Sequence, residues 1–183
     1  MAAETDNPAI GSGLASASKQ ETAMAHAIMS PVTRQTSGPT IMVQTLFAGT
    51  IELGEDQVVS FVEPLLGFEH LERFILFQTQ EGPFLWLQAL DDPSVTLCLT
   101  QPFLLGLDPD YPIGPSDLSE LNEKTLAGLS VYTVVILDKD PQKIRTNLRA
   151  PILVGRKSNQ AKQVVFDHPN LPLQFFLKDL PKR

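Results

Sequence analysis

The chain has 183 residues, a formal net charge of −7, 15 prolines and a single cysteine, Cys98. This length suits one domain with a sizeable core and excludes two large ones, while the lone cysteine excludes an intrachain disulfide framework. No apolar run is long enough to cross a bilayer, and no basic region precedes an apolar core at the N-terminus, so we expect a cytoplasmic protein with no membrane partner.

The charge is unevenly distributed along the chain. Residues 1–40 hold two basic and three acidic groups, residues 41–130 hold two and fourteen, and residues 131–183 hold ten and four. The three segments therefore carry −1, −12 and +6. An acidic middle repels phosphate backbones and attracts basic proteins, by an attraction that salt weakens. A solvated surface that only keeps the domain soluble explains the pattern equally well.

The first 40 residues are rich in Ala, Ser, Thr and Gly and hold few large apolar side chains. Such a composition buries too little surface to offset the entropy of ordering, so we predict a disordered tail over 1–40 and a folded domain over 41–183. From Ile41, short β-branched or aromatic runs alternate with polar turns, which predicts strands. These runs are 42–47, 50–53, 57–62, 73–78, 83–90, 95–100, 131–137, 152–154 and 163–166.

The strand over 131–137 organises the chain, because it is apolar at both odd and even positions. A strand with two apolar faces is central in a sheet or lies in a closed barrel. Pro151 cannot donate to a strand ladder, so the segment from Asn147 to Pro151 is predicted to be a shaped corner that leads into the strand 152–154.

One short helix is predicted after the Pro-rich segment 102–115, with Ser116 as its N-cap and Asp117 near the positive end of its dipole. The pattern as a whole predicts a mainly β fold: a single antiparallel β-barrel-like domain with one short helix and a disordered N-terminal tail.

Chemistry-bearing motifs are missing from the sequence. His26, His70 and His168 have no metal-ligand spacing, and neither a phosphate-binding glycine loop nor a nucleophile elbow occurs. Cys98 has no neighbouring His or basic group to activate it, which favours a structural thiol. Asp91 precedes a second aspartate and a proline, a common turn. We therefore expect no enzyme, no metal and no cofactor.

Two apolar features and one basic feature leave alternatives open. Phe68 follows a loop and either fills the core or meets a partner, with the core favoured. The segment 172–177 either packs on the barrel or serves a partner. A nucleic-acid surface needs aromatic and basic side chains interleaved, whereas here the aromatics lie mainly in the acidic middle of the chain. The basic residues that could still touch phosphate are Arg145, Arg149, Arg156, Lys157 and Lys162.

Several segments together resemble the family of the flagellar assembly factor FliW. They are 61–77 with its Leu-Leu-Gly-Phe-Glu loop, 84–93, Tyr111, 131–134, 146–152 and 163–165. The segments occur in the order of the family and span about residues 42–166. The family usually has proline where this chain has Leu66, and the long N-terminal tail is not a feature of the family.

The resemblance implies a cytoplasmic, non-enzymatic barrel that binds newly made flagellin and, alternatively, the RNA-binding translational repressor CsrA. Holding CsrA away from flagellin messenger RNA would couple the level of flagellin to its translation. We expect a monomer with no direct nucleic-acid partner. The positions that match the motifs of the family and are expected to be structural are Gly67, Asn147, Leu148, Ala150, Pro151 and Gln163.

Our hypothesis for the CsrA surface is acidic. Phe68 and the carboxylates are the candidate partner-binding residues: Glu69, Glu72, Asp91, Asp92, Asp108 and Asp110. One alternative is a dedicated flagellin chaperone without a regulatory role, which would use a groove near Phe68, Leu104, Leu105 and the pair Phe175 and Phe176. A small RNA-binding barrel is the other alternative.

Overall fold

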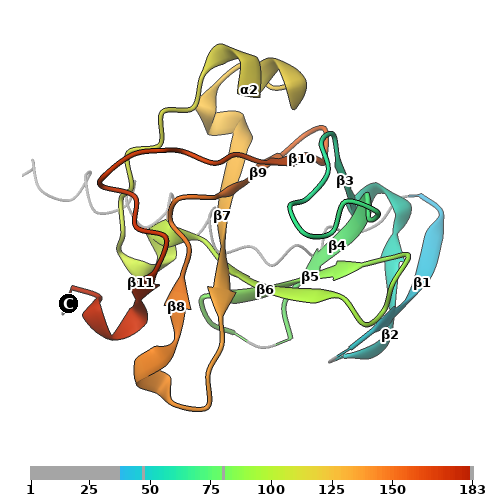
Figure 1. The fold of residues 1–183 in the computed structure, drawn as a ribbon. Helices are drawn as coiled ribbons and strands as arrows, with labels where there is room; N and C mark the ends of the chain where they lie inside the picture. The colour runs from blue at the N-terminus through green and yellow to red at the C-terminus, as the bar shows by residue number, and fades with distance from the viewer. Residues whose placement is uncertain (1–37, 47, 80, 182–183) are drawn as a thin grey trace, which may run out of the picture. The chain divides into compact units, whose positions relative to one another are not determined.

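The structure is a computed structural model that describes residues 38–46, 48–79 and 81–181, and its fold is mainly β (Figure 1). Nearly all of the predicted tail over 1–40, including His26, lies outside the described residues. The domain boundary near residue 40 therefore stays a prediction. The described strands begin at Thr40, one residue before the predicted start of the domain.

Seven strands of the described chain close into a barrel, as the sequence predicts. They are β3 (Val58–Phe61), β4 (Arg73–Phe77), β5 (Phe84–Ala89), β6 (Thr96–Thr100), β7 (Leu129–Ile136), β9 (Ile152–Gly155) and β10 (Gln160–Gln163). Their order around the ring is β7-β6-β5-β4-β3-β10-β9, and a β7–β9 pairing closes it. Neighbours run antiparallel except that β10 runs parallel to β3, with Ala161 opposite Phe61. Closure leaves these strands without a free edge.

The remaining elements surround the barrel. They are β1 (Thr40–Thr45), β2 (Gly49–Gly54), β8 (Arg145–Thr146), β11 (Phe175–Phe176), the helix α2 (Pro115–Glu120), and the 3₁₀ turns η1 (Glu55–Gln57), η2 (Pro102–Leu105), η3 (Leu126–Gly128), η4 (Pro141–Lys143) and η5 (Leu177–Asp179). The strand β11 pairs with β8, so the apolar segment 172–177 packs on the sheet.

Residues that pair directly across neighbouring strands share one face of a sheet, and this rule identifies the barrel interior. Phe74 pairs with Ala89 and Leu87 with Leu97, and these residues face inward. Phe61 lies on the same face and its ring meets that of Phe74 edge-on, with 5.1 Å between centroids. Side chains therefore fill the barrel, as expected for a ring of this size.

The outer face of β4 and β5 is covered by the hairpin of β1 and β2. Gly49 has φ +66°, a conformation that glycine adopts without a Cβ penalty, and it turns β1 back into β2. Val43 of β1 packs with Ile75 and Phe77 of β4 to form an apolar cluster. The hairpin thus extends the core beyond the barrel wall.

Gln88, which is fully buried, fastens the hairpin to β5 and β6. Its Oε1 accepts from the backbone N–H of Leu46 at 3.1 Å and from Thr96 Oγ1 at 2.5 Å. Its Nε2 donates to the carbonyls of Pro93 and Val95, at 3.1 and 3.0 Å. A buried amide with all its bonds made fixes the loop that joins β5 to β6.

Lys162 holds α2 against the barrel. Its Nζ lies 2.5 Å from Glu120 Oε2, 3.3 Å from Asp117 Oδ1 and 3.6 Å from Glu63 Oε1, and its side chain is 9 % exposed. Burial lowers the pKa of Lys162, but the hydrogen bonds and charges of the three carboxylates outweigh it and raise the pKa overall. Beside this cluster, Leu121 packs with Leu129 of β7 and Leu153 of β9 to form a second apolar cluster.

Two predicted elements are shifted in the structure. The last predicted strand, 163–166, was placed three residues too late, because β10 covers Gln160–Gln163. Beyond Gln163 the chain follows the corner instead, with Phe166 N donating to Arg149 O. The helix N-cap is Gly114 and not Ser116, since Pro115 occupies the first helical position and Asp117 accepts from Gly114 N at 2.9 Å.

Candidate binding site at the barrel mouth

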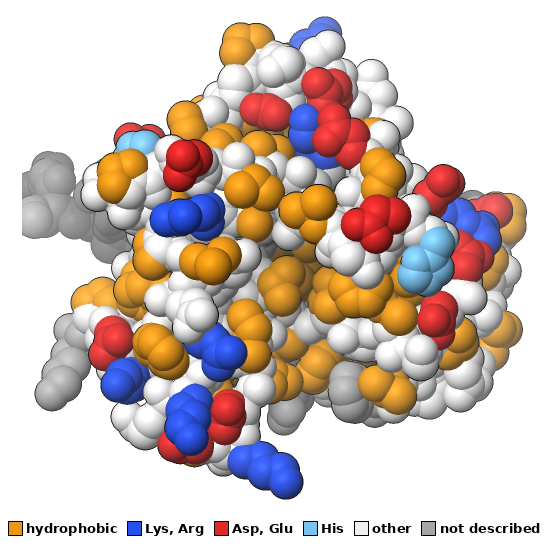
Figure 2. All heavy atoms as spheres, viewed as in Figure 1, with side chains coloured by type: hydrophobic (Ala, Val, Ile, Leu, Met, Phe, Trp, Pro, Cys, Tyr) orange, Lys and Arg blue, Asp and Glu red, His pale blue; other side chains and the backbone are white. Residues whose placement is uncertain are grey.

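One end of the barrel is open and forms a groove of about 390 Å³. Its lining residues, which we call the mouth groove, are Leu65, Leu66, Phe68, Leu97, Val134, Ile136, Asn147, Arg149, Ala150, Gln163, Val165 and Leu173. Val134 and Leu97 occupy inward-facing positions near strand ends, so the groove continues the barrel interior. Figure 2 shows hydrophobic side chains gathered around a hollow in the middle of the viewed face.

The loop between β3 and β4 forms one wall of the groove. Phe68 N donates to Leu65 O at 2.9 Å, and Gly67 has φ +83°, which turns the loop sharply. Leu65 is buried, Leu66 is 60 % exposed, and Phe68 is half-buried in the groove lining. Phe68 is therefore partly covered and also lines the groove, and its contact with a partner stays a prediction.

The predicted corner from Asn147 to Pro151 forms the opposite wall. Asn147 Oδ1 accepts from Arg149 N at 3.0 Å and Ala150 N at 3.2 Å, which confirms that Asn147 ties up backbone groups at a turn. Leu148, Ala150 and Pro151 are buried. The hydrogen bonds of Asn147 hold the corner in shape, and Arg149 at its centre belongs to the groove lining.

Gln163, at the end of β10, spans the floor near this corner. Its Nε2 donates to Ala150 O at 3.3 Å. Its Oε1 is buried and accepts no hydrogen bond from the residues that the structure describes. Leaving a buried acceptor unpaired costs free energy, so this end of the groove is not fully satisfied by the chain itself.

Four of the six predicted carboxylates lie together around His70 and Arg73. Asp91 Oδ1 accepts from Arg73 Nη2 at 2.7 Å, and Glu72 also interacts with the Arg73 charge. Hydrogen bonds from the Gly67 backbone lower the pKa of Glu69. We call Glu69, Glu72, Asp91 and Asp92 the acidic edge.

Asp92, within the acidic edge, accepts from Ser94 Oγ at 2.6 Å, and hydrogen bonds from Ser94 lower its pKa, which confirms the predicted turn.

The two remaining predicted carboxylates do not join the acidic edge. Asp108 and Asp110 lie on the loop between η2 and α2, at the opposite side of Figure 1 from the β3–β4 loop. The six carboxylates therefore do not form one face, because the loops that carry them leave the barrel on different sides.

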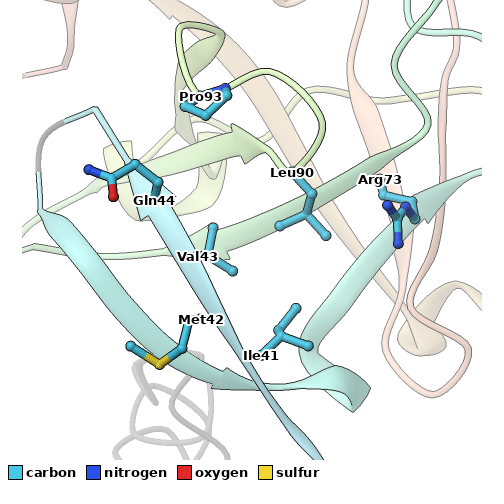
Figure 3. Close-up of a pocket in the computed structure, with 7 residues that line it drawn as sticks. All are labelled: Ile41, Met42, Val43, Gln44, Arg73, Leu90 and Pro93. Atoms are coloured by element: carbon cyan, nitrogen blue, oxygen red, sulfur yellow. The ribbon is translucent and has the colours of Figure 1, made fainter.

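A second depression lies between the β1–β2 hairpin and the barrel, with a volume of about 330 Å³. Ile41, Val43 and Leu90 point toward one another there, whereas Met42 points away (Figure 3). Arg73, which also lines it, is paired with Asp91. This depression is the shallow seam of a packed cluster, and among its described residues no buried side-chain polar atom lacks a hydrogen bond.

The groove predicted for a chaperone is built from other residues than expected. Phe68 lines the mouth groove, but Leu104 and Leu105 belong to η2, and Phe175 and Phe176 pair with β8, outside the lining. Sequence reasoning missed Leu66, Leu97, Val134, Ile136, Val165 and Leu173. The sequence did show that β7 is apolar on both faces. Its inward-facing residues Val134 and Ile136 are only partly buried, and both line the groove.

Neither a metal-binding cluster nor a membrane-spanning helix occurs in the described part of the chain. Among residues 38–46, 48–79 and 81–181, no group of three or more His, Cys, Asp and Glu side chains is placed to hold a metal ion. No helix there is long and apolar enough to cross a bilayer. Cys98 is buried, more completely than the alternation of its strand suggested, and burial raises the pKa of its thiol to about 11.

Comparison with known proteins gives consistent matches. The sequence model described as "FliW protein" matches residues 42–177. A flagellar assembly factor FliW of Clostridium botulinum is 32 % identical over 130 residues, which cover 70 % of this chain and 92 % of the relative. One from Alkaliphilus metalliredigens is 30 % identical, covering 69 % of this chain and 80 % of the relative. A crystal structure of the flagellar assembly factor FliW superposes with a TM-score of 0.70 at 24 % identity, covering 78 % of this chain and 99 % of that one.

The fold and the groove define a small closed β-barrel whose open end is lined by apolar side chains and rimmed on one side by carboxylates. The matched segment covers every barrel strand and both walls of the groove. The chain belongs to the FliW family of flagellar assembly factors.

Proposed function

We propose that this chain is a non-enzymatic regulator of flagellin supply, which binds newly made flagellin and, alternatively, a CsrA-type RNA-binding repressor. The observation that supports it best is the mouth groove, because a family of flagellar assembly factors here presents an open apolar surface. Leu66, Val165 and Leu173 on its rim are each more than half exposed. Exposed apolar surface that gathers in one place is typical of a protein–protein contact.

Flagellin is the partner that we assign to the mouth groove. A groove of aliphatic side chains can bind the apolar face of a helix, and we infer that flagellin contributes such a helix before it assembles. Replacing Leu173 by Asp places a charge on the rim without touching the core, since this side chain is 54 % exposed. We expect this change to weaken flagellin binding and leave the melting temperature unchanged.

The CsrA-type repressor is the partner that we assign to the acidic edge. A protein that binds RNA carries basic surface, and opposite charges accelerate encounter. The β3–β4 loop supplies Leu66 and Phe68 to the mouth groove and Glu69 and Glu72 to the acidic edge. Because one loop serves both surfaces, a large partner on either one excludes the other, which accounts for alternative binding.

A reconstitution with three purified proteins tests this proposal. The tagged chain is mixed with CsrA, and flagellin is added in increasing amounts. We expect CsrA to be recovered with the chain when flagellin is scarce and to be released when flagellin is in excess. Recovery of CsrA that flagellin does not change would refute alternative binding.

Charge reversal tests the acidic edge. The double change Glu69→Lys and Glu72→Lys is compared with Asp108→Lys and Asp110→Lys, which alters the net charge equally but on another side of the barrel. The first variant should slow association with CsrA and reduce its salt dependence, whereas the control should keep both near the wild-type values. Equal effects of the two variants would show that net charge matters and the edge does not.

A dedicated flagellin chaperone is the second candidate, and the same groove favours it. It predicts that flagellin binds as above while CsrA is not recovered at any flagellin level. An RNA-binding barrel finds less support, because Arg149 is the one basic residue and Phe68 the one aromatic residue among the described groove-lining residues.

A further inference from the structure

Arg149 stands out in the mouth groove, because it is a charged residue in an otherwise neutral lining. The other lining residues are aliphatic side chains, Phe68, and the amides Asn147 and Gln163. No acidic residue belongs to the lining, and no carboxylate among the described residues forms an ion pair with Arg149. Every other groove contact that the chain offers to a partner is apolar or uncharged.

Two hydrogen bonds within the chain hold Arg149 in place. Arg149 Nε donates to Leu171 O at 3.1 Å, and Arg149 N donates to Asn147 Oδ1 at 3.0 Å. These two bonds fix the backbone and the plane of the guanidinium, while its two terminal nitrogens make no hydrogen bond within the described chain. A planar fork of donors fixed in this way matches the two oxygens of a carboxylate.

The surroundings favour a strong contact at this position. Arg149 is half-buried beside the apolar groove, where an occupant would displace water from the guanidinium. A half-buried charge that loses its water needs a counter-charge, because desolvation without one is costly. The groove therefore complements an apolar segment that brings one carboxylate, and it penalises an apolar segment that brings none.

We propose that the mouth groove selects an apolar protein segment carrying a carboxylate, which pairs with Arg149 while the apolar part lies against Leu66, Val165 and Leu173. Arg149 is then a specificity-determining residue of the proposed flagellin site. This inference deepens the proposed function and rests on it for the identity of the partner. It does not depend on flagellin for the chemistry of the groove.

The first arm of the test uses small probes and the full chain. Octanoate joins an apolar tail to a carboxylate, and octanamide has the same tail without the charge. In an NMR titration, octanoate should shift the Arg149 Nε–H and the methyl signals of Val165 and Leu173, and should bind about tenfold more tightly than octanamide. The preference should vanish in Arg149→Met. Equal binding of the two probes, or shifts only outside the groove, would overturn the inference.

The second arm uses purified flagellin and a matched control. Arg149→Met should weaken binding roughly 10- to 100-fold, the range for one charged hydrogen-bonded contact. Arg156→Met removes the same charge and a similar bond, since Arg156 Nε donates to Leu129 O at 3.1 Å, but Arg156 is not part of the groove lining. It should change binding less than about threefold. Equal losses in the two variants would overturn the inference.

Changing the carboxylate on flagellin completes the test. Hydrogen exchange identifies the flagellin segment that the chain protects, and each acid in that segment is changed to its amide. One such change should weaken binding to the wild type and have no further effect on Arg149→Met, as a coupled pair requires. A protected segment without an acid, or single-stranded RNA shifting Arg149 where octanoate does not, would contradict the inference. Octanoate binding without flagellin binding would instead refute only the proposed function.

Discussion

Lys162 gives the sharpest stability prediction, since three carboxylates surround it in a partly dry site. The change Lys162→Met keeps most of the aliphatic stem and removes the charge that holds α2 and the start of the β3–β4 loop together. Asp117 is 14 % exposed, whereas Glu120 and Glu63 are 43 % and 56 % exposed. In the variant, water can solvate Glu63 and Glu120. The less exposed Asp117 is left without a counter-charge and therefore accounts for most of the loss of stability.

The expected size of the effect follows from this exposure. Removing one partner of a fully buried ion pair costs about 3–5 kcal/mol. With two of the three acids half in water, we expect about 2–3 kcal/mol, which lowers the melting temperature of a domain of this size by about 5–10 °C. Because folding raises the pKa of Lys162, its stabilisation is complete below the ordinary value of 10.5 and is lost as the pH rises through the higher folded value.

Thermal unfolding followed by circular dichroism at pH 7 and above pH 10.5 measures this effect. Lys157→Met, which changes an exposed lysine on the turn between β9 and β10, is the control and should shift the melting temperature by less than about 2 °C. Adding Asp117→Asn to Lys162→Met should restore part of the loss, because the stranded charge is then gone. A variant as stable as the control, or no recovery with Asp117→Asn, would refute the reasoning.

Three further predictions test the scaffold. Gln88→Met should cost about 2–4 kcal/mol in urea unfolding, because it leaves the buried partners of the amide without bonds. Gly155→Ala should cost about 1–3 kcal/mol, since a Cβ there would crowd Ser158 Oγ and lie 2.9 Å from the backbone oxygen of Leu121, whereas Gly38→Ala, which meets nothing within 4 Å, should be neutral. Cys98 should react with a thiol reagent at pH 8 only in denaturant, because the thiol is buried and its pKa is raised to about 11.

The architecture was predictable because each strand pattern agreed with its turns. The run 131–137 has two apolar faces, and in the closed barrel β7 pairs with β6 on one edge and with β8 and β9 on the other. The prediction was wrong at the last strand, where the residue pattern favours a strand but the backbone hydrogen bonds lead elsewhere. The run Val164 to Phe166 is typical of a strand, yet hydrogen bonds to the corner take it out of the sheet, and the polar segment with Lys162 forms β10 instead.

The candidate site was predictable only in part, because it is assembled from six separate segments of the chain. Asn147, Ala150 and Gln163 entered as structural positions, and the structure places them in a groove with Phe68. Leu173 follows two prolines in an irregular segment, so no periodicity marks it as a rim residue. From the sequence, Arg149 was only a possible phosphate contact. Its position in an apolar groove is visible only in the structure and leads to the carboxylate partner that we propose.

The parallel pairing of β10 with β3 has a consequence for synthesis on the ribosome. Ala161 must reach Phe61, a hundred positions earlier, before the ring can close. Contacts between such distant positions form late and at a high entropic cost. A nascent chain that has not yet produced β10 therefore lacks the closed ring that joins the two walls of the groove. A complete groove therefore needs a finished chain, because Gln163, Val165 and Leu173 in its lining lie at or beyond the end of β10.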